Sequence, residues 1–271
     1  MLIETARQRA RRCDNIAATH ERCVAALTAF DLLVTVVAVL AGAVASVSGF
    51  GVGSFLTPTL ALQIDPRLAV AAVSIPHAVG TALRFWMLRQ HVDRRVLLRF
   101  GAASAAGGLA GAAAGAFVRP DGLRLLLGLL LLIVGAGELK GWTRRLRFDG
   151  PSAWVAGVVS GVFGGLVGNQ GGLRAAALLG FELPKATFVA TATAIALVVD
   201  AARMPIYAFT DGEELRAIAP LILLATAGVV IGTLAGHRVL AAVPQPLFRR
   251  VVALLLLALG AVVIAGAWTA R

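Results

Sequence analysis

The chain has 271 residues, of which 59% are hydrophobic and 14% are charged, and its mean hydropathy is +0.86. About a quarter of the residues of a soluble domain are charged, so this composition excludes an ordinary soluble protein. The 30 glycines lie within long apolar stretches, and membrane helices tolerate glycine. The sequence therefore predicts an all-α, polytopic membrane protein without a separate soluble enzyme domain.

The chain is basic, with 25 Lys and Arg against 14 Asp and Glu and a net charge of +11. In a soluble protein this excess would suggest nucleic-acid binding, but here the basic residues flank apolar segments, as in cytosolic loops of membrane proteins. We therefore expect no nucleic-acid partner. Residues 1–23 form a basic tail, predicted to be cytosolic, that contains both cysteines. With the histidines scattered, no metal site and no cofactor are predicted.

The first apolar stretch, residues 24–47, is long enough to span a bilayer, so we predict a retained first helix rather than a cleaved signal. Further apolar segments follow as far as residue 268. Two of them, 50–63 and 171–181, are shorter than the roughly 20 helical residues that a bilayer core of about 30 Å requires. Each adjoins a cluster of glycines. Both are therefore predicted to be half-helices at a break inside a membrane helix.

A shift of 119 positions aligns the chain with itself without gaps. The shift pairs the glycines of the two breaks and two pairs of arginines, namely Gly49 with Gly168, Gly53 with Gly172, Arg84 with Arg203 and Arg119 with Arg238. We predict an internal duplication, with a first membrane repeat over residues 24–145 and a second over 146–271. Each half consists of a glycine-broken helix followed by three transmembrane helices, and a basic linker over 140–151 joins them.

The charges of the loops favour eight crossings, in which each broken segment crosses once and the N-terminus is inside. This topology places the tail and the basic regions 89–99 and 140–147 in the cytosol, as the positive-inside rule requires. Two later loops disagree, because the acidic residues 211–214 fall inside and the basic residues 238–250 fall outside. A second broken segment that enters and leaves on one side would resolve both disagreements, and it is the alternative topology.

The two breaks are the candidate functional site. Non-helical backbone at membrane depth is tolerated only where it is buried in protein or lines a polar cavity. The half-helix after a break presents unpaired N–H groups and the positive end of its dipole, which suits an anion. Glycine-interrupted segments at matching positions of two repeats are typical of a transporter substrate site. The alternative is that these glycines only allow close helix packing.

Several ionisable side chains lie within apolar segments. Arg174, just beyond the second break, is placed to neutralise an oxyanion, or else pairs with a backbone carbonyl. Arg203 shares a helix face with Asp200, three positions earlier; the pair is either structural or includes a proton-coupling carboxylate. Arg84 lies near the end of its segment, so we expect its side chain to snorkel to the interface. His77 changes charge near neutral pH, which suits proton or anion handling, although a packed imidazole is the alternative.

Tyr207 and the four tryptophans lie near segment ends and are interpreted as interfacial anchors. Asp200 is the predicted proton-coupling residue. The predicted substrate-binding residues are Gly49, Gly51, Gly53, Ser54, His77, Gly168, Asn169, Gln170, Gly171, Gly172, Arg174 and Arg203.

Taken together, these motifs resemble the sulfite exporter TauE/SafE family of membrane transporters over nearly the whole chain. The resemblance rests on residues 49–54 (GFGVGS) and 168–172 (GNQGG), and on the segments that follow each, 66–71 (PRLAVA) after the first and 184–187 (PKAT), leading to 191–193 (TAT), after the second. It implies a secondary transporter of small anions, sulfur-containing ones such as sulfite, sulfonate or related organosulfur anions. The anion would bind between the two broken helices near the bilayer midplane.

The partners expected from this reasoning are a small anion and the lipid of a bacterial cytoplasmic membrane, and the sequence leaves open whether copies of the chain form a homo-oligomer. We expect no enzymatic activity, and the sequence contains no P-loop for ATP. Two other classes remain as alternatives. One is a membrane scaffold that does not transport, and the other is an intramembrane serine hydrolase with Ser54 as nucleophile and His77 as base.

Overall fold

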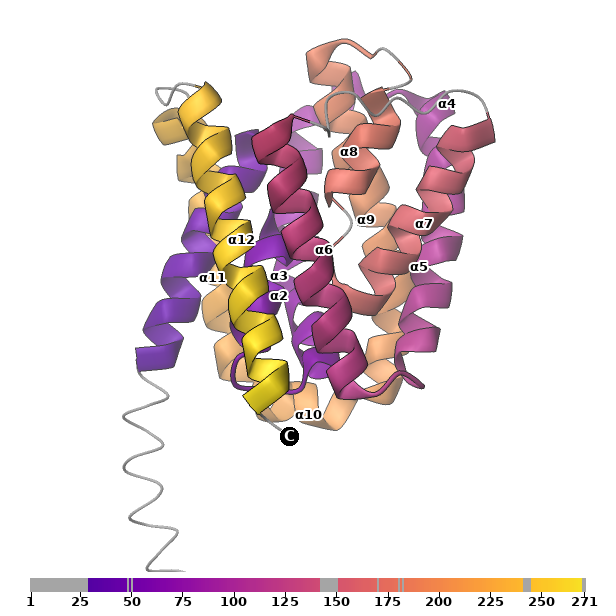
Figure 1. The fold of residues 1–271 in the computed structure, drawn as a ribbon. Helices are drawn as coiled ribbons and strands as arrows, with labels where there is room; N and C mark the ends of the chain where they lie inside the picture. Colours follow the sequence, from indigo (N-terminus) through magenta and orange to yellow (C-terminus); the bar gives the residue numbers. More distant parts are fainter. Residues whose placement is uncertain are drawn as a thin grey trace, which may run out of the picture.

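The structure is a computed structural model that describes residues 29–47, 49, 51–141, 151–169, 171–179, 181, 183–240 and 245–269. Every regular element in these ranges is a helix, which confirms the all-α prediction. After a first helix, Ala29–Val47, the long elements are α2 (Val52–Leu60), α3 (Pro66–Leu88), α5 (Ala102–Gly115), α6 (Pro120–Lys140), α7 (Pro151–Val167), α8 (Gly171–Leu179), α9 (Lys185–Thr210), α11 (Ala219–Leu240) and α12 (Gln245–Thr269). Short helices α4 (Arg94–Val96) and α10 (Gly212–Ala217) lie at opposite ends of the bundle (Figure 1). The basic tail and Gln170 lie outside the described residues.

Within the described ranges, six helices are long and apolar enough to cross a membrane, and two shorter apolar helices, Pro151–Val167 and Arg250–Gly266, accompany them. Large apolar side chains are exposed on the outer helices, for example Leu129 and Ile133 of α6 and Leu254 of α12. Exposed apolar surface of this extent on long helices is what lipid tails require. The chain is therefore a multi-pass membrane protein.

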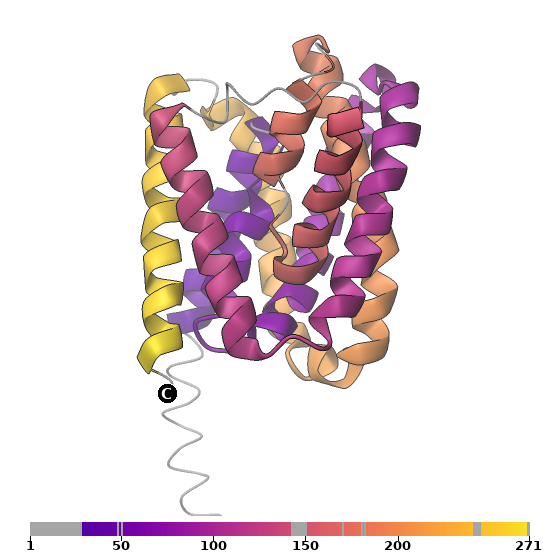
Figure 2. The same cartoon turned by 45° about the vertical axis from the view of Figure 1, so that its right-hand side comes forward.

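Helices α2 and α8 have nine residues each, so each is about 13 Å long, less than half of a bilayer core. Helix α2 turns back toward the α10 end, where the first helix begins, and α8 turns back toward the α4 end, where α7 begins (Figures 1 and 2). Each broken segment is thus a re-entrant hairpin. The prediction of eight crossings is wrong in this respect, because it counted each broken segment as one crossing and placed the beginning of the first helix on the same side as residues 89–99. For the second broken segment, the direction of α8 agrees with the alternative topology.

The backbone at both breaks requires glycine. Gly49, Gly51 and Gly168 have φ angles of 79°, 137° and 70°, which side chains with a Cβ rarely adopt. Gly49 and Gly168 are also a pair under the 119-residue shift, and each follows directly on the helix that leads to its break. The two breaks therefore share a left-handed glycine at matching positions, while the duplication itself stays a prediction.

Other glycines, outside the two breaks, serve close helix packing. A Cβ added to Gly107 or Gly111 of α5 would collide with a backbone oxygen of α7, and one added to Gly161 of α7 would collide with a backbone oxygen of α5. Gly232 of α11 approaches Val39 of the first helix in the same way. Without side chains between them, the two backbones of each pair come into direct contact, which is a common way to associate helices in lipid.

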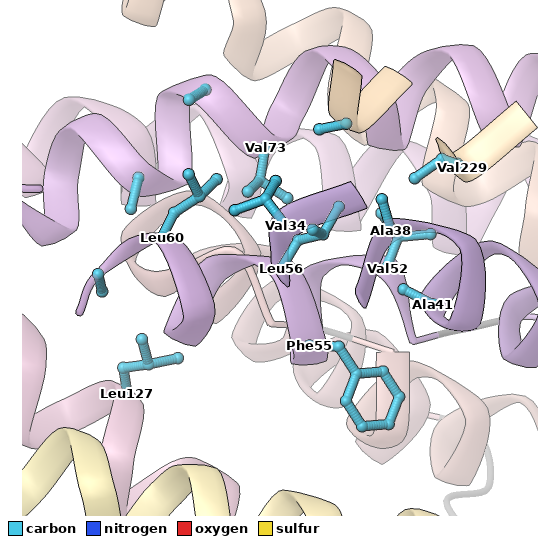
Figure 3. Close-up of a cluster of buried hydrophobic side chains, with 14 of the residues drawn as sticks. Val34, Ala38, Ala41, Val52, Phe55, Leu56, Leu60, Val73, Leu127 and Val229 are labelled. Carbon is cyan, nitrogen blue, oxygen red and sulfur yellow. The ribbon is translucent and has the colours of Figure 1, made fainter. Parts of the chain in front are cut away.

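Helix α2 lies in the interior, and all nine of its residues are buried. Its side chains Val52, Phe55, Leu56 and Leu60 pack in a cluster to which the first helix, α3, α6 and α11 also contribute (Figure 3). A second cluster includes Ala177 and Leu178 of α8. The packing therefore holds both half-helices inside the bundle rather than at its surface.

The two breaks meet at Gly53. A Cβ on this residue would lie against the carbonyl group of Gly168, a backbone group that cannot rotate away. We expect Gly53→Ala to lower the free energy of unfolding by about 1–3 kcal/mol, the usual cost of overpacking. Thermal unfolding of the purified protein in detergent measures this. Gly266→Ala, in α12 with open space around it, is the matched control and should not lower the midpoint; an unchanged midpoint for Gly53→Ala would contradict the close contact.

Candidate functional site

A small cavity of about 10 Å³ lies where the two breaks meet. Its lining residues are Gly49, Gly51, Gly53, Ser54, His77, Gly168, Asn169, Gly171 and Arg174. His77 is at the middle of α3, so the cavity is at mid-depth of the bundle. Its volume corresponds to about one water molecule. Polar groups from both hairpins therefore line a space with room for about one water molecule.

The structure brings together most of the predicted substrate-binding residues in this lining. Gly172 belongs to the first turn of α8. Arg203 lies outside the lining, although it contacts Asp200, which in turn contacts His77. Gln170 is outside the described residues. The sequence motif thus identified the region, whereas Arg203 has a different place from the one predicted.

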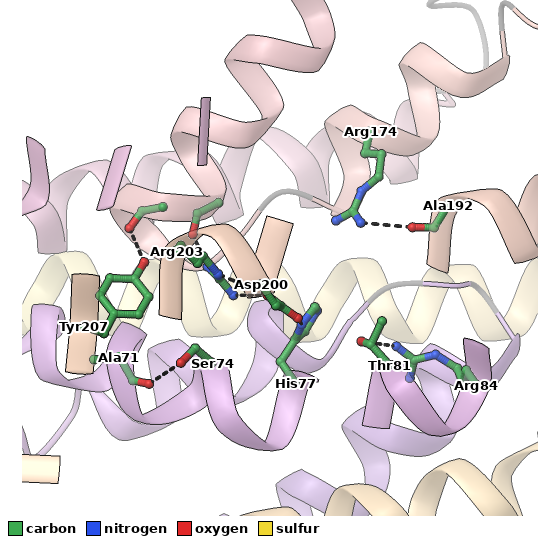
Figure 4. A network of polar contacts seen from close by, with 12 residues as sticks. Ala71, Ser74, His77, Thr81, Arg84, Arg174, Ala192, Asp200, Arg203 and Tyr207 are labelled. Carbon is green, nitrogen blue, oxygen red and sulfur yellow. Dashed lines mark hydrogen bonds and ion pairs between the residues drawn. The ribbon is translucent and has the colours of Figure 1, made fainter. Parts of the chain in front are cut away.

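Asp200 of α9 is the centre of a buried polar cluster (Figure 4). Its side chain is fully buried, and its Oδ2 atom lies 2.5 Å from Nδ1 of His77 on α3. Its Oδ1 atom accepts hydrogen bonds from Nε and Nη2 of Arg203, at 3.1 and 2.8 Å. A buried carboxylate is tolerated only with such partners. The cluster therefore joins α3 to α9 beside the cavity.

Arg203 and Tyr207 support the end of α7. Arg203 donates from Nη1 to the carbonyl of Gly164, and the Tyr207 hydroxyl donates to the carbonyl of Gly165 at 2.6 Å. The last carbonyls of a helix have no intrahelical partners, and a cation at that end is favourable. The break after α7 thus needs these donors. Tyr207 is buried, so its prediction as an interfacial anchor is wrong, whereas Trp86 is exposed.

Arg174 occupies the first turn of α8 and is buried, with only 4% of its surface exposed. Its Nη1 atom donates to the carbonyl of Ala192 on α9 at 3.1 Å. The predicted alternative, pairing with a backbone carbonyl, is therefore present in the structure. A guanidinium has five N–H donors, and this one also lines the cavity. One contact to Ala192 orients the group and leaves other donors for a ligand.

Ser54 and Asn169 face each other across the two breaks. The Ser54 hydroxyl donates to Oδ1 of Asn169 at 2.9 Å, while Nδ2 of Asn169 is buried and has no partner in the described part of the chain. Buried donors without a partner are uncommon because they cost free energy. A serine hydrolase would direct the Ser54 proton to His77, but it is directed to Asn169. The arrangement favours a ligand that accepts hydrogen bonds over a nucleophilic serine.

Among the described residues, positive charge exceeds negative charge at this centre. Arg84, Arg174 and Arg203 are all buried, as is Asp200, so three positive charges against one negative leave an excess of two in this part of the chain. Arg84 does not snorkel as predicted, because its Nη2 atom donates inward to the Thr81 hydroxyl at 3.0 Å on the helix face that includes His77. Uncompensated buried charge is costly. An anion would remove this cost.

Sequence reasoning did not single out Thr57. Its hydroxyl is buried and has no partner among the described residues, and it lies next to Gly168. Thr57 is three positions after Ser54 in α2, so both residues are on one helix face toward the second break. That spacing is the only signal in the sequence that could have identified it.

Comparison with known proteins gives one match. Residues 34–263 match the family model described as sulfite exporter TauE/SafE. The match includes both breaks and every residue of the buried polar cluster. No curated protein and no solved structure matches the chain.

The cluster around Asp200 makes a prediction for stability. Asp200→Asn removes the charge that Arg203 needs while both groups stay buried, so the free energy of unfolding should fall by about 3–5 kcal/mol. Glu213→Gln removes the same charge from an exposed position of α10 and should change it by less than about 1 kcal/mol. Denaturation of both variants in detergent, followed by circular dichroism, measures the difference. Equal stability of the two variants would contradict the structural role of Asp200.

Proposed function

The chain belongs to the sulfite exporter TauE/SafE family, a family of membrane transporters, and from this premise we propose that it binds and transports small sulfur-containing anions at the two breaks. The substrates would be sulfite, sulfonates or related organosulfur anions. The observation that carries the proposal is the excess of buried positive charge beside a cavity lined by Arg174. A buried cation without a carboxylate partner is a natural place for an anion.

The donors around the cavity suit an oxyanion. Arg174 presents a planar fork of N–H groups, and Nδ2 of Asn169 is an unused buried donor in the described structure. Gly171, at the start of α8, lines the same cavity. Backbone N–H groups at a helix start and the positive end of the helix dipole attract anions. Three kinds of donor therefore converge on one point at mid-depth.

Transport requires this point to open alternately to each side. The cavity of about 10 Å³ holds about one water, so a sulfur oxyanion enters only when the hairpins separate. The two hairpins run in opposite directions in the bundle (Figures 1 and 2), and we infer from this that the two halves are inverted repeats. Inverted repeats around a central site allow one half to move against the other. The membrane would be the cytoplasmic membrane of a bacterium.

We further infer that the pair His77 and Asp200 carries a coupling proton. The two side chains are 2.5 Å apart, and His77 also lines the cavity. Protonation of His77 adds positive charge beside the anion, while Asp200 stays paired with Arg203. Such a buried acid–base pair at a substrate site is typical of proton-driven transport. Proton and anion would then bind cooperatively because their charges are opposite.

Flux measurements test the anion site. In proteoliposomes, we expect saturable uptake of labelled sulfite or sulfonate by the wild type, and a loss of about tenfold or more for Arg174→Ala, which loses charge-assisted hydrogen bonds. Arg250→Ala, exposed on α12, is the control and should keep its flux. Size-exclusion profiles and melting temperatures verify that both variants fold. Unchanged flux in folded Arg174→Ala would contradict the site, and wild type without flux of any anion would favour the scaffold alternative.

An imposed proton gradient tests the coupling. Wild-type uptake should change with the gradient, whereas His77→Gln should exchange anions across the membrane without responding to it, because the group that takes the proton is gone. His91→Gln is the matched control, since His91 is exposed near the end of α3. A gradient response that survives in His77→Gln would disprove the assignment of His77.

A further inference from the structure

Arg84 is a buried cation that does not belong to the cavity lining described above. It is 3% exposed, its Nη2 atom donates to Thr81, and its Nε and Nη1 atoms are buried without a partner in the described ranges. It does not line the cavity between the breaks. Guanidinium stays charged in proteins, and a buried charge without a counter-ion is strongly unfavourable. A negative charge beside Arg84 would therefore stabilise the structure.

Comparison with the second half of the chain shows which charged group the first half lacks beside its arginine. The 119-residue shift pairs Arg84 with Arg203 and Thr81 with Asp200. Each arginine donates to the side chain three positions earlier, Arg203 to a carboxylate and Arg84 to a hydroxyl. The hydroxyl satisfies one N–H but brings no charge. The first half thus has the same cation as the second without its carboxylate.

Arg84 lies at the same level of the bundle as Arg174. It is seven residues, about 10 Å, beyond His77 on the same face of α3. Because α3 and α9 run in opposite directions and His77 contacts Asp200, Arg84 is opposite the part of α9 that contains Ala192, the residue that Arg174 contacts. Figure 4 shows Arg84, Arg174 and Ala192 on one side of the His77–Asp200 pair.

We propose that Arg84 and Arg174 together form a second anion station, above the cavity toward the α4 end, and that this two-arginine station selects an oxyanion with two negative charges. The proposal deepens the transport function and rests on it. Two cations that repel each other are stabilised by a dianion between them, whereas a monoanion neutralises only one. Arg174 belongs to both the cavity and the two-arginine station, because its side chain lines the cavity and points toward α9. A transported anion would pass from the cavity to this station.

An internal carboxylate tests the station. Thr81→Asp places a carboxylate three positions before Arg84, as Asp200 is placed before Arg203, and it competes with the anion. Thr81→Asn has nearly the same shape without the charge and is the matched control. The full-length protein in detergent is titrated with sodium sulfate, a dianion, and with sodium methanesulfonate, a monoanion of similar shape, against gluconate at equal ionic strength. The readout is the shift in melting temperature and the dissociation constant derived from it.

We expect the wild type to bind sulfate more tightly than methanesulfonate, and Thr81→Asp to weaken sulfate binding by about tenfold or more. Thr81→Asn should bind sulfate within about threefold of the wild type. Arg84→Gln should lose the preference for sulfate without a lower melting temperature in gluconate, because an uncompensated buried charge has been removed. An exposed control, Arg95→Gln, should retain the preference.

Other results overturn the proposal. Sulfate binding by Thr81→Asp equal to that of the wild type would show that no anion lies at Arg84. Equal weakening in Thr81→Asp and Thr81→Asn would assign the effect to the threonine hydroxyl. If Arg174→Ala abolishes binding but Arg84→Gln does not, the two-arginine station fails while the transport site stands. A wild type that neither binds nor transports any of these anions would refute the proposed function itself.

Discussion

The contact between Asp200 and its two partners is the interaction on which the centre of the bundle depends. Asp200 is fully buried, and it is bound on one side by Arg203 of its own helix and on the other by His77 of α3. Arg203 and Tyr207 in turn hold the last carbonyls of α7. Breaking a helix inside a membrane exposes backbone groups that lipid cannot satisfy. The cluster therefore supplies hydrogen-bond donors to the backbone at the second break, and it fixes α3, α7 and α9 relative to one another.

The two breaks can meet only because the residues in contact are glycines, which have no side chain. Gly53 lies against the Gly168 carbonyl with no room for a Cβ, and positive φ angles at Gly49 and Gly168 turn each chain back on itself. The same lack of side chains along α5 and α7 brings those helices into contact. Glycine thus has two separate roles in this protein. At the breaks it allows a backbone conformation, and along the long helices it allows a short distance.

The charges of the centre explain why such an arrangement is useful to a transporter. Among the described residues, Asp200 neutralises one of three buried arginines, and one of the remaining two, Arg174, lines the cavity where the hairpins converge. A site with uncompensated positive charge is stabilised when an anion binds, and it is destabilised when it is empty. Since proton uptake at His77 adds to the positive charge, the energies of proton and anion binding are linked through a single cluster. Alternating access around this point then carries both the proton and the anion across the membrane.

Composition and periodicity alone determined that the chain is an all-helical membrane protein. The glycine clusters located both breaks and eight of the nine residues that line the cavity, all except His77. These features are local, because segment length, hydropathy and the conformations open to glycine follow from neighbouring residues. Three features needed the tertiary structure. The direction of each half-helix depends on packing against α3 or α9, and the burial of Arg84 and Tyr207 depends on which helix faces them. The role of Arg203 depends on a carbonyl 39 residues earlier in the chain. A sequence shows which charges lie in the membrane, but only the contacts between distant helices decide which of them have partners.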